Sequence, residues 1–163
     1  MKTHELRAFT PPKSQAKTFV VGAWKSRRSS RLREMLKLPP RGKPLLDAIT
    51  KGFSVQILRD VAGTLSVDVY KLGTYIDIKT ATLNRRLRDG VLTTDESDRL
   101  YRFTEVYDAT LDLFDGDKTM ADQWLNSPAL GLGGEAPISV IRTSTGANDV
   151  LALIHKIEHG VLV

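Results

Sequence analysis

The apolar residues of this chain recur mainly at helical spacing. The clearest case is a stripe with intervals of 3, 4, 4 and 3 residues, formed by Leu100, Phe103, Tyr107, Leu111 and Phe114. Such a stripe is typical of a long amphipathic helix, whereas a half-buried strand alternates every two residues. From Pro44 onward the helical period dominates and strand alternation is scarce. We therefore predict a mainly α fold.

Residues that start and stop helices divide the chain into several shorter helices around the long one. Pro44 suits a first helical position, and Gly52 and Gly90 suit helix ends. Thr94 is predicted to cap the long helix, and Trp124 and Leu125 to anchor a core that follows it. Other helices are expected at residues 29–38, 45–51, 54–61, 67–75, 80–89, 137–143 and 146–159.

Charge is sorted along the sequence. Residues 1–44 carry twelve Lys or Arg against two acidic residues, residues 45–94 seven against five, and residues 95–163 five against twelve. The net charges of these segments are +10, +2 and −7, within a total of +5. Such a gradient predicts a basic surface for nucleic acid and a separate acidic surface for another partner. On the long helix, Glu105, Asp108 and Asp112 are expected to form either a solvated face or an acidic docking face.

The chain is predicted to have three parts. Residues 1–43 form a basic N-terminal arm, residues 44–92 a helix-turn-helix domain, and residues 93–163 a small α-helical domain. The arm contains the apolar segment 19–24 and is therefore expected to pack on its own body or on a second copy as a dimerisation element.

The helix-turn-helix assignment rests on residues 67–89. Two short helices are joined by Asp77-Ile78-Lys79, where Ile78 is expected to enter the core. In the second helix, Leu83 and Leu87 stack at i, i+4 and are predicted to face inward. The opposite face and its edges then carry Ala81, Thr82, Asn84, Arg85 and Arg88.

This outer face has the chemistry of a DNA-reading helix. Thr80 and Arg85 are predicted to contact base edges, and Ala81 a thymine methyl group. The predicted DNA-binding residues are Lys79, Thr80, Thr82, Asn84, Arg85, Arg86 and Arg88, among which Lys79, Arg86 and Arg88 are assigned to phosphates. The alternative is that these cations only solvate an open helix face.

An enzyme is not favoured. His155-Lys156-Ile157-Glu158-His159 matches the H-x-x-E-H pattern of some zinc peptidases, but only four residues follow His159, too few for a third ligand downstream. There is no Cys, and the loop Gly131–Gly134 lacks the Lys-Ser/Thr of a phosphate-binding loop. The longest apolar run, residues 19–24, is too short to span a bilayer. We expect a binding protein without a metal or cofactor, located in the cytoplasm and not on a membrane.

The order of residues from Arg85 to Gly160 resembles that of the Xre/MbcA/ParS-type antitoxins. The segment from Leu92 to Gly160 looks like their toxin-binding domain, and the helix-turn-helix before it looks like their Xre/Cro-like DNA-binding part. The matching positions are Arg85-Arg86-Leu87, Leu92, Glu96-Ser97-Asp98-Arg99-Leu100, Arg102, Leu113-Phe114, Ala121, Trp124-Leu125, Pro128, Leu130-Gly131, Pro137, Thr143, Gly146, Val150, Ile157 and Gly160. The first 43 residues lie outside the resemblance.

The resemblance implies a function in a type II toxin-antitoxin system. Such antitoxins neutralise a RES-domain toxin, an enzyme that consumes NAD, by forming a complex with it, and they repress the operon that encodes both proteins. It also implies that the C-terminal end approaches the toxin's NAD pocket, through His155, His159, Gly160, Val161, Leu162 and Val163. An acidic last third would suit a pocket that binds pyrophosphate.

Two alternatives stay open at this point. The last residues are equally compatible with a frayed end that packs on the final helix. The whole chain is also compatible with a stand-alone helix-turn-helix transcriptional regulator that has a C-terminal dimerisation or ligand module. For the antitoxin, the expected partners are the RES-domain toxin, operator DNA and a second copy of the chain, with the protein on the nucleoid when it is bound to its operator.

Overall fold

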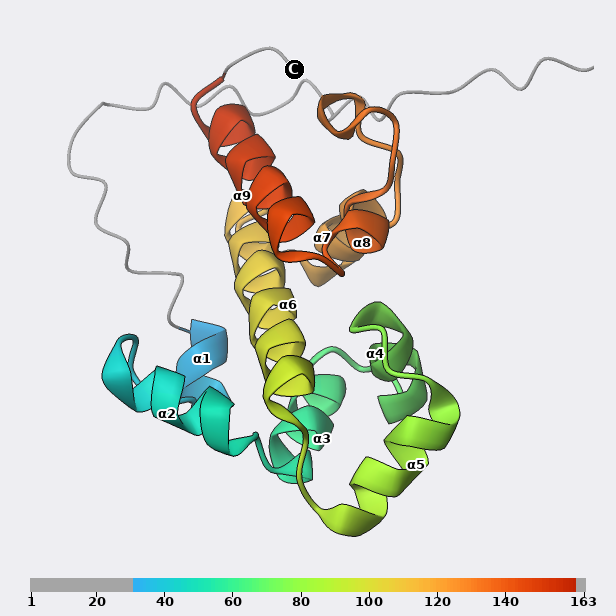
Figure 1. Cartoon of the computed structure of the whole chain (residues 1–163). Coiled ribbons are helices and arrows are strands. Elements are labelled where there is room, and N and C mark those ends of the chain that lie inside the picture. Colours follow the sequence, from blue (N-terminus) through green and yellow to red (C-terminus); the bar gives the residue numbers. More distant parts are fainter. Residues whose placement is uncertain (1–30, 161–163) are drawn as a thin grey trace, which may run out of the picture.

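The computed structural model describes residues 31–160, and these residues are mainly α-helical with no strand (Figure 1). The predicted fold class is confirmed. The helices are α1 (Arg31–Met35), α2 (Lys43–Lys51), α3 (Val55–Thr64), α4 (Val69–Tyr75), α5 (Thr80–Asp89), α6 (Thr94–Leu113), α7 (Lys118–Leu125), the 3-10 helix η1 (Leu130–Leu132), α8 (Pro137–Val140) and α9 (Ser144–Glu158). None of the helices in this range is long and apolar enough to cross a membrane.

Side-chain caps decide where several helices begin. Asp68 accepts hydrogen bonds from the N–H groups of Tyr70 and Lys71 and starts α4, and Thr143 accepts one from Gly146 and starts α9. The prediction that residues 137–143 form one helix is therefore too long, because Thr143 belongs to the next helix. Thr94 as the cap of α6 is also wrong. The cap is Thr93, which forms a capping box with Glu96.

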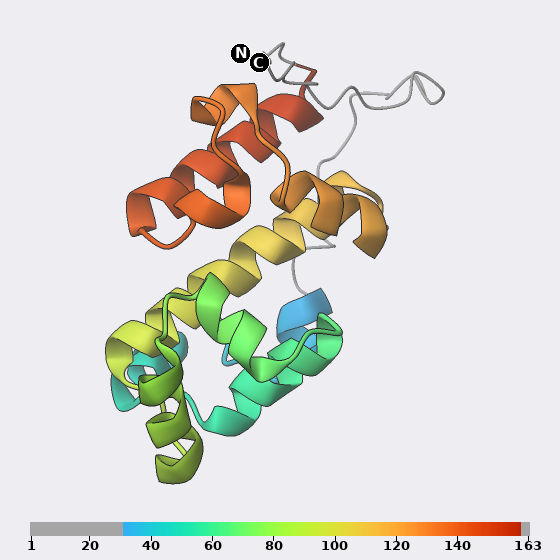
Figure 2. The ribbon, with the colours of Figure 1, turned by 90° about the vertical axis from the view of Figure 1, so that its right-hand side faces the viewer.

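The 20-residue helix α6 holds the molecule together. Helices α2 to α5 surround its N-terminal half, and α7 to α9 lie along its C-terminal half (Figures 1 and 2). Both groups pack apolar side chains against it. Fully buried side chains of this core include Leu100 and Val106 of α6 itself, and Leu58, Leu72, Leu83, Val150 and Ile154 of the surrounding helices. The core is therefore continuous from the helix-turn-helix to α9, and α6 belongs to both halves.

The described part of the basic arm packs on the body of the protein. Leu32 of α1 and Leu36, which directly follows this helix, are only 3% exposed and belong to the main core against α6. The apolar segment 19–24 lies outside the described residues.

The prediction of a solvated or docking acidic face on α6 is wrong for Asp108, because this residue is only 4% exposed. Its burial raises its pKa to about 6, and the nearby Asp112 adds to this effect, while a backbone hydrogen bond from Leu32 opposes it. Glu105 is half-buried and forms ion pairs with Arg33 and Arg41. Residues 31–41 thus cover this face and neutralise part of its charge.

Candidate DNA-binding and toxin-binding surfaces

The turn between α4 and α5 is built by close packing. Asp77, which follows α4, adopts the left-handed backbone conformation with φ 55°. Ile78 is buried, as expected, and its N–H donates to the carbonyl of Gly73 at 2.8 Å. A Cβ on Gly73 would lie 2.8 Å from Leu83 Cδ2, so a glycine lets α4 and α5 approach each other. Two short helices are therefore held in a helix-turn-helix.

The structure brings the predicted DNA-binding residues together along α5. Leu83 is fully buried and Leu87 is half-buried, as the helical spacing predicts. Thr82 is half-buried at the edge. Apart from Asp89 at the C-terminal end of α5, the exposed positions on α5 and directly before it are Lys79, Thr80, Ala81, Asn84, Arg85 and Arg88. They form one polar, cationic surface, which we call the α5 face.

Tyr70 is a further residue of the α5 face that the sequence analysis missed. It lies in the first turn of α4, is half exposed, and its hydroxyl donates a hydrogen bond to Asn84 Oδ1 at 3.0 Å. This contact joins residues 14 positions apart. The helical period relates residues within one helix, so it does not predict a contact between two helices. The one signal in the sequence is the tyrosine itself, whose hydroxyl usually finds a hydrogen-bond partner.

Arg86 differs from the other cations of α5. Its side chain is only 16% exposed, and its Nε donates to Glu96 Oε2 at 2.7 Å. The same carboxylate oxygen accepts the N–H of Thr93 at 2.8 Å. Burial opposes ionisation of Glu96, but the hydrogen bonds from Arg86 and Thr93 outweigh it and hold the pKa of Glu96 below its usual range. Arg86 therefore connects α5 to the start of α6.

The C-terminal candidate residues lie at the far end of α9. His155 is exposed, with Nδ1 3.4 Å from Glu158 Oε2. His159 Nδ1 lies 2.7 Å from the backbone oxygen of His155, so both rings contact their own helix. Gly160 is exposed, and Val161, Leu162 and Val163 lie outside the described residues. Within residues 31–160 no three His, Asp or Glu side chains are grouped so as to hold a metal ion.

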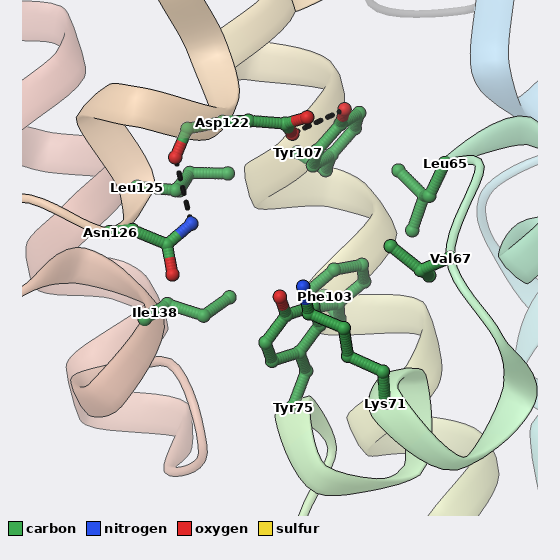
Figure 3. Close-up of a pocket in the computed structure, with 10 residues that line it drawn as sticks. All are labelled: Leu65, Val67, Lys71, Tyr75, Phe103, Tyr107, Asp122, Leu125, Asn126 and Ile138. Atoms are coloured by element: carbon green, nitrogen blue, oxygen red, sulfur yellow. Dashed lines mark hydrogen bonds between the residues drawn. The ribbon is translucent and has the colours of Figure 1, made fainter. Parts of the chain in front are cut away.

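Between the two halves, a small cavity of about 90 Å³ opens beside α6 (Figure 3). Tyr75, Phe103 and Tyr107 stack along it with ring centroids 5.8 and 6.1 Å apart. The Tyr107 hydroxyl donates to Asp122 Oδ1 at 2.9 Å, and burial, followed by this contact, raises the pKa of Tyr107. Side chains of α4, α6 and α7 therefore meet where the two halves face each other.

Comparison with protein families separates the same two halves. Residues 44–105 match the antitoxin Xre-like helix-turn-helix domain, and residues 109–160 match the antitoxin Xre/MbcA/ParS C-terminal toxin-binding domain. An Antitoxin Xre of Yersinia enterocolitica is 41% identical over 122 residues, which cover 74% of this chain and 82% of that protein. The chain belongs to the Xre antitoxin family. The resemblance inferred from the sequence is confirmed.

Other relatives agree with this family. An Antitoxin Xre of Photorhabdus laumondii is 37% identical over 126 residues, covering 76% of this chain and 85% of that protein. A Prs ADP-ribosylating antitoxin of a Sphingobium species is 26% identical over 71% of this chain and 78% of its own length. The first family match ends at residue 105 and the second begins at residue 109, and both positions lie inside α6. The domain boundary between residues 92 and 93 stays a prediction.

Proposed function

We propose that this antitoxin neutralises an NAD-consuming RES-domain toxin by direct complex formation, and that it represses the operon encoding both proteins as a homodimer in the bacterial cytoplasm. The observation that carries the proposal is the separation of two surfaces. The α5 face and the C-terminal end of α9 lie at opposite ends of the molecule in both views (Figures 1 and 2). One chain thus has room for DNA and a protein partner at the same time.

The α5 face supports sequence-specific DNA binding. Its first residues, Thr80 and Ala81, are exposed where reading helices approach base edges, and Arg85 follows one turn later on the same side. Arg85 suits a bidentate contact to guanine, and Asn84 one to adenine. The hydrogen bond from Tyr70 fixes the oxygen side of the Asn84 amide. An oriented amide discriminates bases better than one that is free to rotate.

Phosphate contacts are assigned to the exposed cations Lys79 and Arg88. Arg86 is assigned a positioning role, since its guanidinium is held by Glu96. Loss of Arg86 should therefore act on DNA binding through the placement of α5, and not through a missing phosphate contact.

We propose that the toxin-facing surface lies in residues 109–160, which match the toxin-binding domain, and in the residues that follow. The acidic charge of the last third is not all available to a partner, because Glu105 is paired and Asp108 is buried. The exposed acidic side chains that remain include Asp117, Glu135 and Asp149. These steer the antitoxin to a basic nucleotide pocket, and His155, His159 and residues 160–163 are proposed to contact the toxin there.

Co-expression tests this function directly. The full chain is expressed with the RES-domain protein encoded beside it, and we expect restored growth, recovery of NAD and copurification of both proteins. Removal of residues 161–163 should abolish neutralisation and leave operator binding unchanged. If the RES-domain protein still inhibits growth when the wild-type chain is co-expressed, and the two proteins do not copurify, the proposed function is refuted.

A further inference from the structure

The loop that contains η1 presents an exposed leucine on a rigid support. Leu130 is 74% exposed, the largest value among the exposed large apolar side chains in residues 31–160. Its loop is closed by backbone hydrogen bonds from Ala129 N–H to Glu135 O at 3.1 Å and from Gly134 N–H to Ala129 O at 3.0 Å. Gly133 adopts a positive φ of 68°, which the tight loop requires. The loop therefore holds an apolar side chain in solvent.

The base of this loop packs tightly on α9. A Cβ on Gly131 would lie 2.6 Å from Leu153 Cδ1, so the backbone of η1 rests on the helix. Leu153 is buried, whereas Leu130 is not. Core packing thus explains Gly131 and Leu153, but it does not explain why a large apolar residue occupies position 130.

A groove runs beside the loop between η1, α8 and α9. Its volume is about 320 Å³, its apolar wall includes Leu132, Val140 and Ala152, and Asp149 and Lys156 line it with opposite charges. Because Asp149, Ala152 and Lys156 recur at helical spacing, the groove follows one stripe of α9. The loop and the groove therefore form one surface on α9, because Gly131 and Leu132 of the loop line the groove.

We propose that Leu130 and this groove are the anchor by which the antitoxin docks on its toxin, with Leu130 in an apolar depression of the toxin and an apolar toxin side chain in the groove. This inference rests on the proposed function. All of these residues lie within the match to the toxin-binding domain. A preordered apolar side chain loses little conformational entropy on binding, and a few such buried contacts carry most of an interface's affinity. DNA does not fit this surface, since its charged groups, Asp149 and Lys156, balance each other.

Two substitutions test the anchor in the full chain. Leu130→Asp places a charge in the proposed depression, and Ala152→Arg fills the groove without removing a good helix former. Leu46→Asp is the matched control, because Leu46 is 63% exposed on α2 in the other half of the molecule. Affinity for the neighbouring RES-domain protein is measured by calorimetry, together with thermal stability and operator affinity of each variant.

We expect Leu130→Asp and Ala152→Arg each to weaken the toxin complex at least about thirtyfold, as for a hot-spot residue. Thermal stability and operator affinity should stay at wild-type values, and Leu46→Asp should bind the toxin like the wild type. Wild-type toxin affinity of both groove variants would overturn the anchor, as would an equal loss in Leu46→Asp. A loss of self-association alone would assign the groove to a second copy instead. If the wild-type chain itself does not bind the RES-domain protein, the proposed function is refuted, and the anchor that rests on it is refuted as well.

Discussion

Replacement of Arg86 by alanine tests whether this cation contacts DNA or connects two helices. The side chain lies on α5 between two exposed arginines, but its Nε is 2.7 Å from Glu96 Oε2. Glu96 is 4% exposed and accepts the Thr93 N–H in the capping box of α6. Arg86→Ala therefore leaves a buried carboxylate with one of its two hydrogen-bond donors.

Breaking a buried ion pair typically costs 3–5 kcal/mol, and the retained Thr93 bond favours the lower end, about 3 kcal/mol. In a chain of this size, about 1 kcal/mol corresponds to 2–4 °C, so the melting temperature should fall by about 6–12 °C. Because the pKa of Glu96 is lowered in the folded state, the stabilisation is present above its usual value of 4.5 and is lost as the pH falls through the folded pKa. The difference from the wild type should thus be largest near neutral pH and shrink in acid.

Thermal unfolding at several pH values and titration with operator DNA at low temperature measure these effects. Arg85→Ala is the matched control, since Arg85 is the preceding residue and is exposed. It should keep the wild-type melting temperature and lose about 1–3 kcal/mol of discrimination between operator sequences. The double variant Arg86→Ala, Glu96→Gln should recover part of the lost stability, because glutamine keeps an acceptor for Thr93 without the charge. An Arg86→Ala protein with wild-type stability and a uniform loss on all DNA would refute the structural role and make Arg86 a phosphate contact.

Three further outcomes are expected. Asp108→Asn should stabilise the protein by about 1 kcal/mol at pH 7.5 in chemical unfolding, because a raised folded pKa penalises the charged form above pH 6; the gain should vanish near pH 4. Gly146→Ala should cost about 2–3 kcal/mol, since its Cβ would lie 1.9 Å from Val140 O, whereas Gly63→Ala, which meets nothing within 4 Å, should be neutral or stabilising. Footprinting of a homodimer should protect two half-sites about 34 Å apart, and a single half-site would contradict the dimer.

Local chemistry explains how much of the helical layout the sequence predicted. Residues 80–89 match α5 at both ends, because Gly90 adopts the left-handed conformation that ends the helix. The start of α6 was misplaced by one residue, since Thr93 and Thr94 are chemically equivalent caps and only the bond to Glu96 selects Thr93. Helix α7 begins at Lys118 and is capped by Asp117, a cap that the sequence analysis did not single out.

In the candidate sites, too, some features follow from the sequence and others depend on the tertiary structure. Exposure of Ala81, Arg85 and Arg88 follows from the 100° helical step and the inward position of Leu83. The partner of Arg86 does not follow from it, because Glu96 lies on another helix. Nor did periodicity indicate the groove near Leu130, which depends on how η1, α8 and α9 pack.

The sequence by itself determined the helical class, the order of the helices, the helix-turn-helix and the family, because periods, caps and residue order are local properties. Only the tertiary structure decided which charges are available to partners. Arg33 and Arg41 of the basic segment pair with Glu105, and Asp108 is buried beneath α1. Some of the charges that make up the gradient therefore pair with each other within the protein. Charges that are far apart in the chain interact in this way only after folding brings them together.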